Sequence, residues 1–274
     1  MKYSFPELLL LFFIYAFLGW CAEVAFAACK HGRFVNRGFL NGPLCPIYGF
    51  GLLIVVLFLR PVQENLPLLF LGSFLLTTLL ELITGVVLEK LFHTRWWDYS
   101  GMPLNIGGYV CLLFSLIWGA ACVLILKWVH APIYMLTHRM PLTILYILDA
   151  ALCLEFALDL TATILTIRRL SERLTHLTAL AKEMHALSDE MGESIFEHTI
   201  AAKERYEENR ERLEEHRAEL ERRLNELRAR REALLREKRF GHRRLLEAFP
   251  NMTNARHGEA IAHLREAIRA RRGR

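Results

Sequence analysis

The chain has 274 residues, 53% of them hydrophobic, and a formal net charge of +5. Residues 1–167 carry nine basic and nine acidic side chains, whereas residues 168–274 carry 25 basic and 20 acidic ones, so the net charge lies on the second part. This separation excludes a single soluble globular domain. It predicts an all-α membrane protein with a soluble helical tail.

Five apolar stretches in the first part are candidate membrane spans, since the hydrocarbon core of a bilayer requires about 20 helical residues. The second stretch is the shortest and contains Gly49 and Gly51, so it is either a short span or a re-entrant segment, and we expect a span. We therefore predict a polytopic helix bundle over 1–167, with spans near Glu7–Cys29, Cys45–Leu59, Leu66–Phe92, Asn105–Val129 and Met140–Ile167.

Basic residues near the membrane predict the orientation of these spans, because cytoplasmic loops are enriched in Lys and Arg. With the tail in the cytoplasm, eight basic residues lie inside and four outside. We predict a multi-pass protein of the bacterial inner membrane with its N-terminus outside. A cleaved signal peptide is the alternative for the first stretch, but Glu23 interrupts its apolar run and the run is longer than a signal peptide needs.

Two loops have unusual compositions. The first, over residues 32–51, is rich in glycine and proline, which cannot continue a helix, so its backbone groups must be bonded by protein rather than lipid. Its candidate residues are Arg33, Arg37, Gly38, Gly42, Pro43, Pro46, Tyr48 and Gly49. The second, over residues 88–105, places aromatic rings beside an Arg/Asp pair, as is typical of a membrane interface. Its candidate residues are Arg95, Trp97, Asp98, Tyr99 and Asn105.

The predicted spans also contain acidic residues, which are costly within a bilayer and usually face the bundle interior. The functional interpretation is a polar cavity on the cytoplasmic side for a cation, a proton or a positively charged solute, formed by Glu23, Glu81, Glu89, Glu155 and Asp159. The structural alternative is that some acids are protonated and the others form ion pairs. In that alternative Arg33, Arg37 and Arg95 pair with Glu23, Glu89 and Asp98.

The two loops resemble blocks of a bacterial membrane-protein family named putative ABC-transporter permeases of type IV. The resemblance rests on the run from Gly38 to Gly49, on the later run from Glu81 to Gly119, and on Trp20 and Glu23, and it covers about residues 10–130. It implies a transporter subunit with this fold but no substrate or catalytic residue. The acids of the fifth span and the tail are expected to lie outside it.

The tail begins with an apolar seam of alternating four- and three-residue spacing, which is typical of a coiled coil. The seam consists of Leu170, Leu174, Leu177, Ala181, Met184, Ser188, Met191 and Ile195. Further on only half of a seam is apolar, at Tyr206, Leu213, Leu220, Leu227 and Leu234. We predict a charged coiled-coil helix over 168–248 that associates with a second copy or a helical partner. The alternative is a solvated helix held by ion pairs, and an unbroken helix over 168–239 would extend roughly 100 Å.

A short basic amphipathic helix is predicted within residues 249–274. It has Ala260, Ile261, Leu264, Ala267 and Ile268 on one side and Arg265, Arg269, Arg271 and Arg272 on another. Such a helix packs on a partner helix or lies on anionic lipid. Its basic residues are a non-specific signal, so we expect no nucleic-acid partner.

Motifs for nucleotide binding and hydrolysis are missing from the sequence. It contains no GxxxxGK[ST], HExxH or GxSxG motif, and its six cysteines form no CxxC pair, so we expect free thiols, no metal and no cofactor. We predict a transporter subunit that needs a separate ATPase rather than an enzyme. The alternatives are a membrane scaffold that acts through its tail, and a membrane enzyme using Glu81, His93 and Asp98 as acid/base groups.

Overall fold

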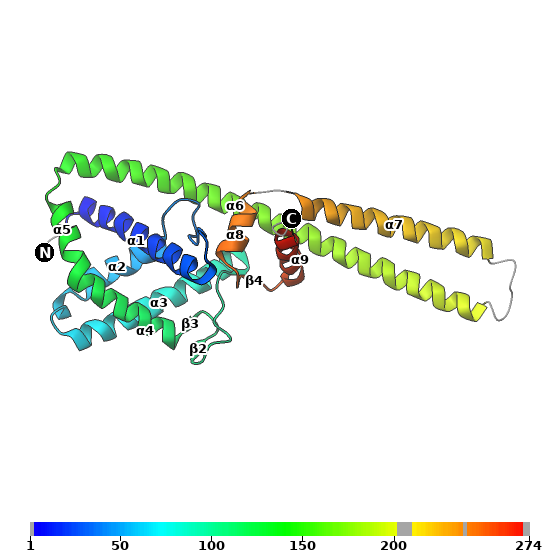
Figure 1. Ribbon diagram of the computed structural model, residues 1–274, viewed down its shortest axis with the longest axis horizontal. Helices are drawn as coiled ribbons and strands as arrows, with labels where there is room; N and C mark the ends of the chain where they lie inside the picture. The colour runs from blue at the N-terminus through cyan, green and yellow to red at the C-terminus, as the bar shows by residue number, and fades with distance from the viewer. Residues whose placement is uncertain (1–2, 202–209, 238–239, 271–274) are drawn as a thin grey trace. The chain divides into compact units, whose positions relative to one another are not determined.

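A computed structural model describes residues 3–201, 210–237 and 240–270 of the chain, and most of them are helical (Figure 1). They form two compact units. The membrane unit contains Met1–Ile167 and Phe240–Ala255, and the tail unit contains Arg168–Arg239 and Arg256–Arg274. The segment 240–255, which the sequence assigns to the tail, therefore packs with the membrane part.

The membrane unit contains the first five helices and the beginning of the sixth. They are α1 (Phe5–His31), α2 (Pro46–Phe58), α3 (Leu66–Phe92), α4 (Leu112–Leu124), α5 (His130–His138) and α6 (Leu142–Ala201), with a short 3-10 turn at Arg60–Val62 and a π-helical turn at Ile125–Val129. The segment 240–255 adds α8 (Phe240–Ala248) and the strand β4 (Thr253–Asn254). β4 pairs antiparallel with β1 (Thr94–Arg95), and β2 (Asn105–Ile106) forms a hairpin with β3 (Val110–Cys111).

Four of the helical segments among the described residues are long and apolar enough to cross a membrane. They are Phe5–Lys30, Leu66–Phe92, Leu112–His138 and Leu142–Glu193. Our predicted span at Asn105–Val129 is displaced, because its first residues form the β2–β3 hairpin and its helix continues to His138. α2 has 13 residues, about 20 Å of helix, which is shorter than the roughly 30 Å hydrocarbon core. Whether it crosses as a fifth span stays a prediction.

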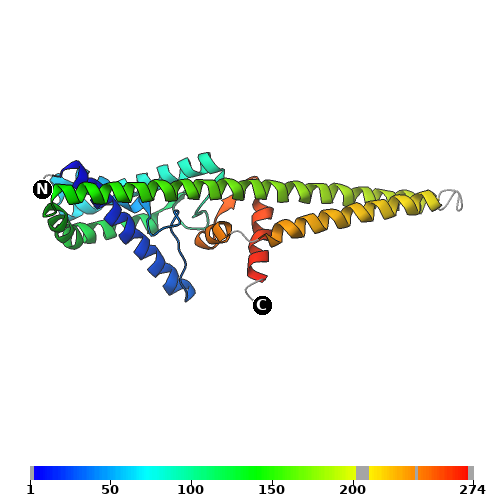
Figure 2. The same ribbon diagram turned by 90° about the horizontal axis from the view of Figure 1, so that it is seen from above.

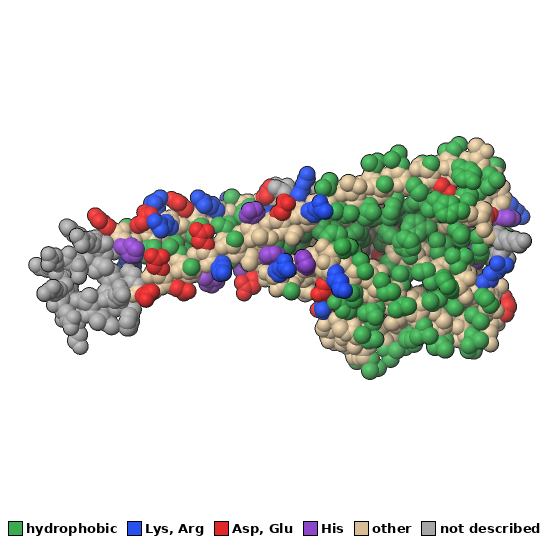
Figure 3. Space-filling view, turned by 180° about the vertical axis from the view of Figure 1, so that it is seen from behind, with side chains coloured by type: hydrophobic (Ala, Val, Ile, Leu, Met, Phe, Trp, Pro, Cys, Tyr) green, Lys and Arg blue, Asp and Glu red, His purple; other side chains and the backbone are tan. Residues whose placement is uncertain are grey.

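Helix α1 provides much of the core of the membrane unit. Leu11 and Tyr15 pack in one buried cluster with Leu52 and Val55 of α2. Glycine makes this close packing possible, since a Cβ at Gly49 would lie 2.7 Å from the backbone oxygen of Phe12. On the outside, apolar side chains cover much of the membrane unit, whereas charged ones line the tail unit (Figure 3). A lipid-facing surface explains this contrast.

In the tail unit, the part of α6 after residue 167 and α7 (Arg210–Arg236) lie side by side and run in opposite directions (Figures 1 and 2). An unbroken helix over 168–239 is therefore wrong. The reason is visible in the half-apolar second seam, whose Leu220 and Leu227 are buried with Leu187 of α6 in one cluster. The chain thus supplies its own helical partner within this unit.

The predicted first seam is correct at several positions and shifted at another. Leu170, Leu174 and Leu177 are buried, but Ser188 is exposed and its neighbour Leu187 is buried in its place. Tyr206, Arg271 and Arg272 lie outside the described residues, as do the side chains of Ile195 and Leu213.

The closing helix, α9 (Gly258–Ala270), packs within the tail unit. Its apolar side is buried at Ala260, Ile261 and Leu264, and His257 just before it contacts the hydroxyl of Thr178 at 2.9 Å. Since α9 contacts α7, the chain itself covers the apolar side that we had considered for a partner helix or lipid.

Candidate functional site

The first loop is bonded to α6 through Asp159. Its carboxylate accepts the backbone N–H groups of Asn41 at 3.0 Å and Gly42 at 2.7 Å, and the side-chain amide of Asn41 at 2.9 Å. Thr163, one turn later on α6, also contacts the Asn41 amide at 3.0 Å. Backbone donors that cannot be bonded by lipid thus find a carboxylate, and Asp159 holds the loop rather than lining an open cavity.

A second anchor of the first loop is Asn36. Its side-chain oxygen accepts the indole N–H of Trp20 at 2.8 Å and the backbone N–H of Gly38 at 3.2 Å, and its amide donates to the backbone oxygen of Asn41 at 2.7 Å. The sequence interpretation missed both Asn36 and Asn41. Their position in a glycine-rich loop is a signal that could have identified them, since Asn commonly bonds nearby backbone groups in turns.

Glu23 of α1 joins the first loop to α2. It accepts the Tyr48 hydroxyl at 2.6 Å and forms an ion pair with Arg37 at 3.4 Å. The ring of Tyr48 packs edge-on against Trp118 of α4, with centroids 5.3 Å apart, and Pro46 begins α2 two residues earlier. Tyr48 thereby connects the loop carboxylate to the interior of the bundle.

Glu81 of α3 forms a matching pair with the second loop. The hydroxyl of Tyr99 donates to one oxygen of the Glu81 carboxylate at 3.2 Å, and the Tyr99 ring stacks on Phe114 of α4 at 5.0 Å. Glu81 is 9% exposed, and its second carboxylate oxygen has no hydrogen-bond partner among the described residues. Burial raises the pKa of Tyr99 above its ordinary value.

The two carboxylate–tyrosine pairs interact with each other. Glu23 acts electrostatically on Glu81 and on Tyr99, and Tyr99 acts on Tyr48. The four residues come from α1, α2, α3 and the second loop, so elements far apart in the sequence converge on one polar cluster. We call Glu23, Tyr48, Glu81 and Tyr99 the Glu–Tyr cluster.

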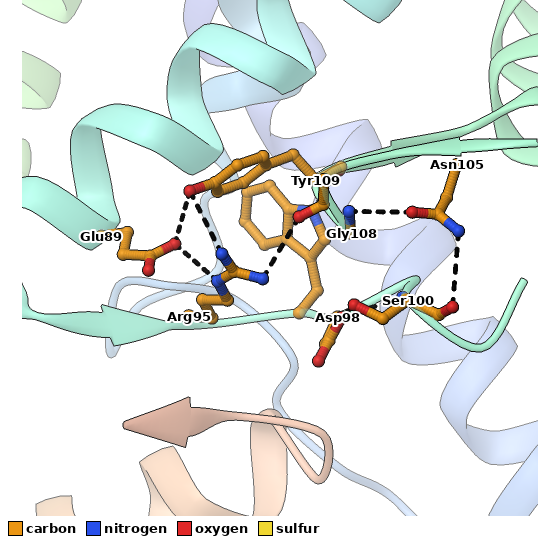
Figure 4. A network of polar contacts seen from close by, with 9 residues as sticks. Glu89, Arg95, Asp98, Ser100, Asn105, Gly108 and Tyr109 are labelled. Carbon is orange, nitrogen blue, oxygen red and sulfur yellow. Dashed lines mark hydrogen bonds and ion pairs between the residues drawn. The ribbon is translucent and has the colours of Figure 1, made fainter. Parts of the chain in front are cut away.

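The second loop is organised by an ion pair (Figure 4). Arg95 donates to Glu89 at 2.7 Å, Tyr109 donates to the same carboxylate oxygen at 2.7 Å, and a further Arg95 N–H donates to the backbone oxygen of Gly107 at 3.2 Å. The indole N–H of Trp97 donates to the backbone oxygen of Tyr109 at 2.8 Å. The hydrogen bonds to Glu89 raise the pKa of both Arg95 and Tyr109.

The remaining polar residues of the second loop shape its turns. Asp98 accepts both the hydroxyl and the backbone N–H of Ser100, which lowers the pKa of its carboxyl. Asn105 donates to the backbone oxygen of Met102 at 2.8 Å and accepts the backbone N–H of Gly108 at 3.0 Å. Gly108 has φ = +77°, a conformation that favours glycine.

The structure thus separates the predicted site residues into several groups. Of the ion pairs proposed as the structural alternative, Arg37–Glu23 and Arg95–Glu89 are present, whereas Asp98 binds Ser100 instead. The loop also contains Gly38, Gly42 and Pro43. Glu155 is exposed on α6, and a Cβ at Gly42 would lie 3.1 Å from one of its oxygens. Arg33 is exposed as well.

The pattern of a known family covers this arrangement. The family described as "Putative ABC-transporter type IV" matches residues 10–164, more than half of the chain. The chain belongs to this family. The match contains both loops and the Glu–Tyr cluster, and it extends over Glu155 and Asp159, so our expectation that the resemblance ends near residue 130 is wrong. No curated protein and no solved structure matches the chain.

Proposed function

We propose that the chain is a permease-like subunit of an ABC transporter, placed in the bacterial inner membrane with its tail in the cytoplasm. We further propose that the Glu–Tyr cluster is its site for a cation, a proton or a positively charged solute. Family membership and the apolar helices support the membrane and transporter assignment. The basic residues of the two loops support the orientation.

The single observation that carries the proposed site is the buried carboxylate of Glu81. One of its oxygens has no partner among the described residues, and a second carboxylate, Glu23, acts on it electrostatically. Two acids that interact in a low-dielectric interior repel each other when both are ionised. A cation or a shared proton relieves that repulsion, which is the physical reason for assigning this ligand class.

The energy for active transport would come from a partner, because the sequence has no phosphate-binding loop of the ATPase type. Purification in a mild detergent, followed by mass spectrometry of the eluate, tests this part of the proposal. An ATPase that co-purifies with the chain supports it. An eluate with only copies of the chain or cell-envelope assembly proteins contradicts it.

The proposed site is tested by the substitution Glu81→Gln, which keeps the shape of the side chain and removes the ionisable group. In a deletion strain complemented with this variant, we expect the transport phenotype to be lost while detergent-purified protein elutes normally in size exclusion. The matched control is Glu155→Gln, which also neutralises an acid within the predicted spans but lies on an exposed face. Equal activity of the two variants would contradict the assignment.

The second candidate function is a membrane scaffold, because the tail is a compact unit of its own and lies outside the family match. The structure allows this alternative to be tested separately. Gly241 packs on Thr166, where an added Cβ would lie 2.6 Å from the Thr166 methyl carbon, so residues 167 and 240 can be joined by a short linker. A chain with 1–167 linked to 240–255 should keep the phenotype of a permease and lose that of a scaffold.

A further inference from the structure

The segment 240–255 binds both loops that the family pattern covers. On the first loop, the guanidinium of Arg244 in α8 donates to three successive backbone oxygens, those of Gly38 at 2.9 Å, Phe39 at 3.1 Å and Leu40 at 2.8 Å. Arg244 is 8% exposed. Three consecutive carbonyls that converge on one planar group form a site that reads the position of the arginine closely.

On the second loop, the same segment continues as a strand. β4 pairs with β1 through Thr94↔Asn254 and Arg95↔Thr253, and the buried Asn254 amide donates to the Thr94 hydroxyl at 2.9 Å. The ring of Phe249 packs edge-on against the buried Trp96, with centroids 5.0 Å apart. Hydrogen bonds, strand pairing and aromatic packing therefore act on two loops that are far apart in the sequence.

The chemistry of Arg244 argues for recognition rather than for packing alone. Among the described residues no carboxylate lies within ion-pair distance of it, and its Nε has no hydrogen-bond partner. Burial lowers its pKa, although the charge of Asp159 acts in the opposite direction. A buried arginine commonly stabilises a fold less than an apolar residue of similar volume would, while its geometry confers specificity. The contact is therefore specific and costly, as suits a reversible one.

We infer that the backbone oxygens of residues 38–40 and the edge of β1 form a docking face for a helix–turn–strand segment, and that the chain occupies this face with its own residues 240–255 as a releasable latch. The segment lies in the sequence between α7 and α9, both of which belong to the tail unit. The latch thus fastens the tail to the two loops. This inference does not depend on the proposed transport function.

Hydrogen exchange of the full-length protein in detergent tests the latch, with Arg244→Met as the central variant. Each charge-assisted hydrogen bond contributes about 1.4 kcal/mol or more, which is a factor of ten in the opening equilibrium. We therefore expect exchange to be at least about tenfold faster in peptides that contain residues 36–42 and 240–255. The matched control is Arg243→Met, because Arg243 is exposed on the same helix and pairs with Glu247.

A second variant, Asn254→Ala, keeps the test informative if Arg244→Met does not fold. It should increase exchange at residues 93–97 and 250–255, again without an effect from the Arg243 control. Unchanged or slower exchange at residues 36–42 in Arg244→Met would overturn the inference, since the segment would then be held by packing alone. Loss of a dimer in light scattering together with faster exchange would also overturn it, because a second copy would be supplying the segment.

Discussion

The substitution Asp159→Asn tests the role that the structure gives to α6 in holding the first loop. The carboxylate accepts three hydrogen bonds from Asn41 and Gly42, at 2.7 to 3.0 Å. Asparagine has one acceptor oxygen, so at least one of these donors would face an NH₂ group instead. An unsatisfied buried donor costs about 1–3 kcal/mol, and replacing charged by neutral acceptors weakens the remaining bonds, so we expect a loss of about 2–4 kcal/mol.

The matched control is Glu155→Gln, one turn earlier on the same helix. Its side chain is exposed, so a change within about 0.5 kcal/mol is expected. Thermal unfolding in detergent measures the difference. With about 2–4 °C of Tm for each kcal/mol in a chain of this size, Asp159→Asn should unfold roughly 4–16 °C below the control. A Tm of Asp159→Asn no lower than that of Glu155→Gln would refute the assigned role.

Two further predictions concern the second loop and the orientation. Gly108→Ala should lower stability by about 1–3 kcal/mol, because Gly108 has φ = +77° and an added Cβ would lie 2.6 Å from the Asp98 carboxylate, whereas Gly101→Ala, with open space around it, should be neutral in the same unfolding assay. If both variants unfold together, the turn geometry is wrong. In a background without native cysteines, an impermeant thiol reagent applied to intact cells should label a cysteine at Gln63 and not one at Ser188. The reverse result would invert the orientation.

The sequence predicts the elements of this fold well where the pattern is local. Long apolar runs predict α1 and α3 to within a few residues, and the glycines and prolines of the first loop predict that it is not helical. The ion pairs of Arg37 and Arg95 also follow from proximity along the chain. In each case the partners are fewer than 15 residues apart.

Contacts between distant parts of the chain could not be predicted in this way. Asn41 and Asp159 are separated by 118 residues, and Arg244 and Gly38 by 206. In sequence, Asp159 resembles its neighbour Glu155, yet only Asp159 is bonded to the loop. Likewise Arg244 lies in a charged stretch that predicts a solvated helix. The half-apolar seam of α7 indicated an incomplete interface, but it gave no means of telling a second copy from the chain's own α6.

Labelling of Glu81 by a carbodiimide tests the central claim most directly, because this reagent attacks protonated carboxyl groups in apolar surroundings. Protein in native membranes would be treated over a range of pH, with and without added sodium, potassium or tetraethylammonium, and the modified peptides identified by mass spectrometry. If the Glu–Tyr cluster binds a proton or a cation, Glu81 should be labelled, and its labelling should fall as the pH rises or as one of these cations is added. An unlabelled Glu81, or labelling that is the same under every condition, would contradict the account.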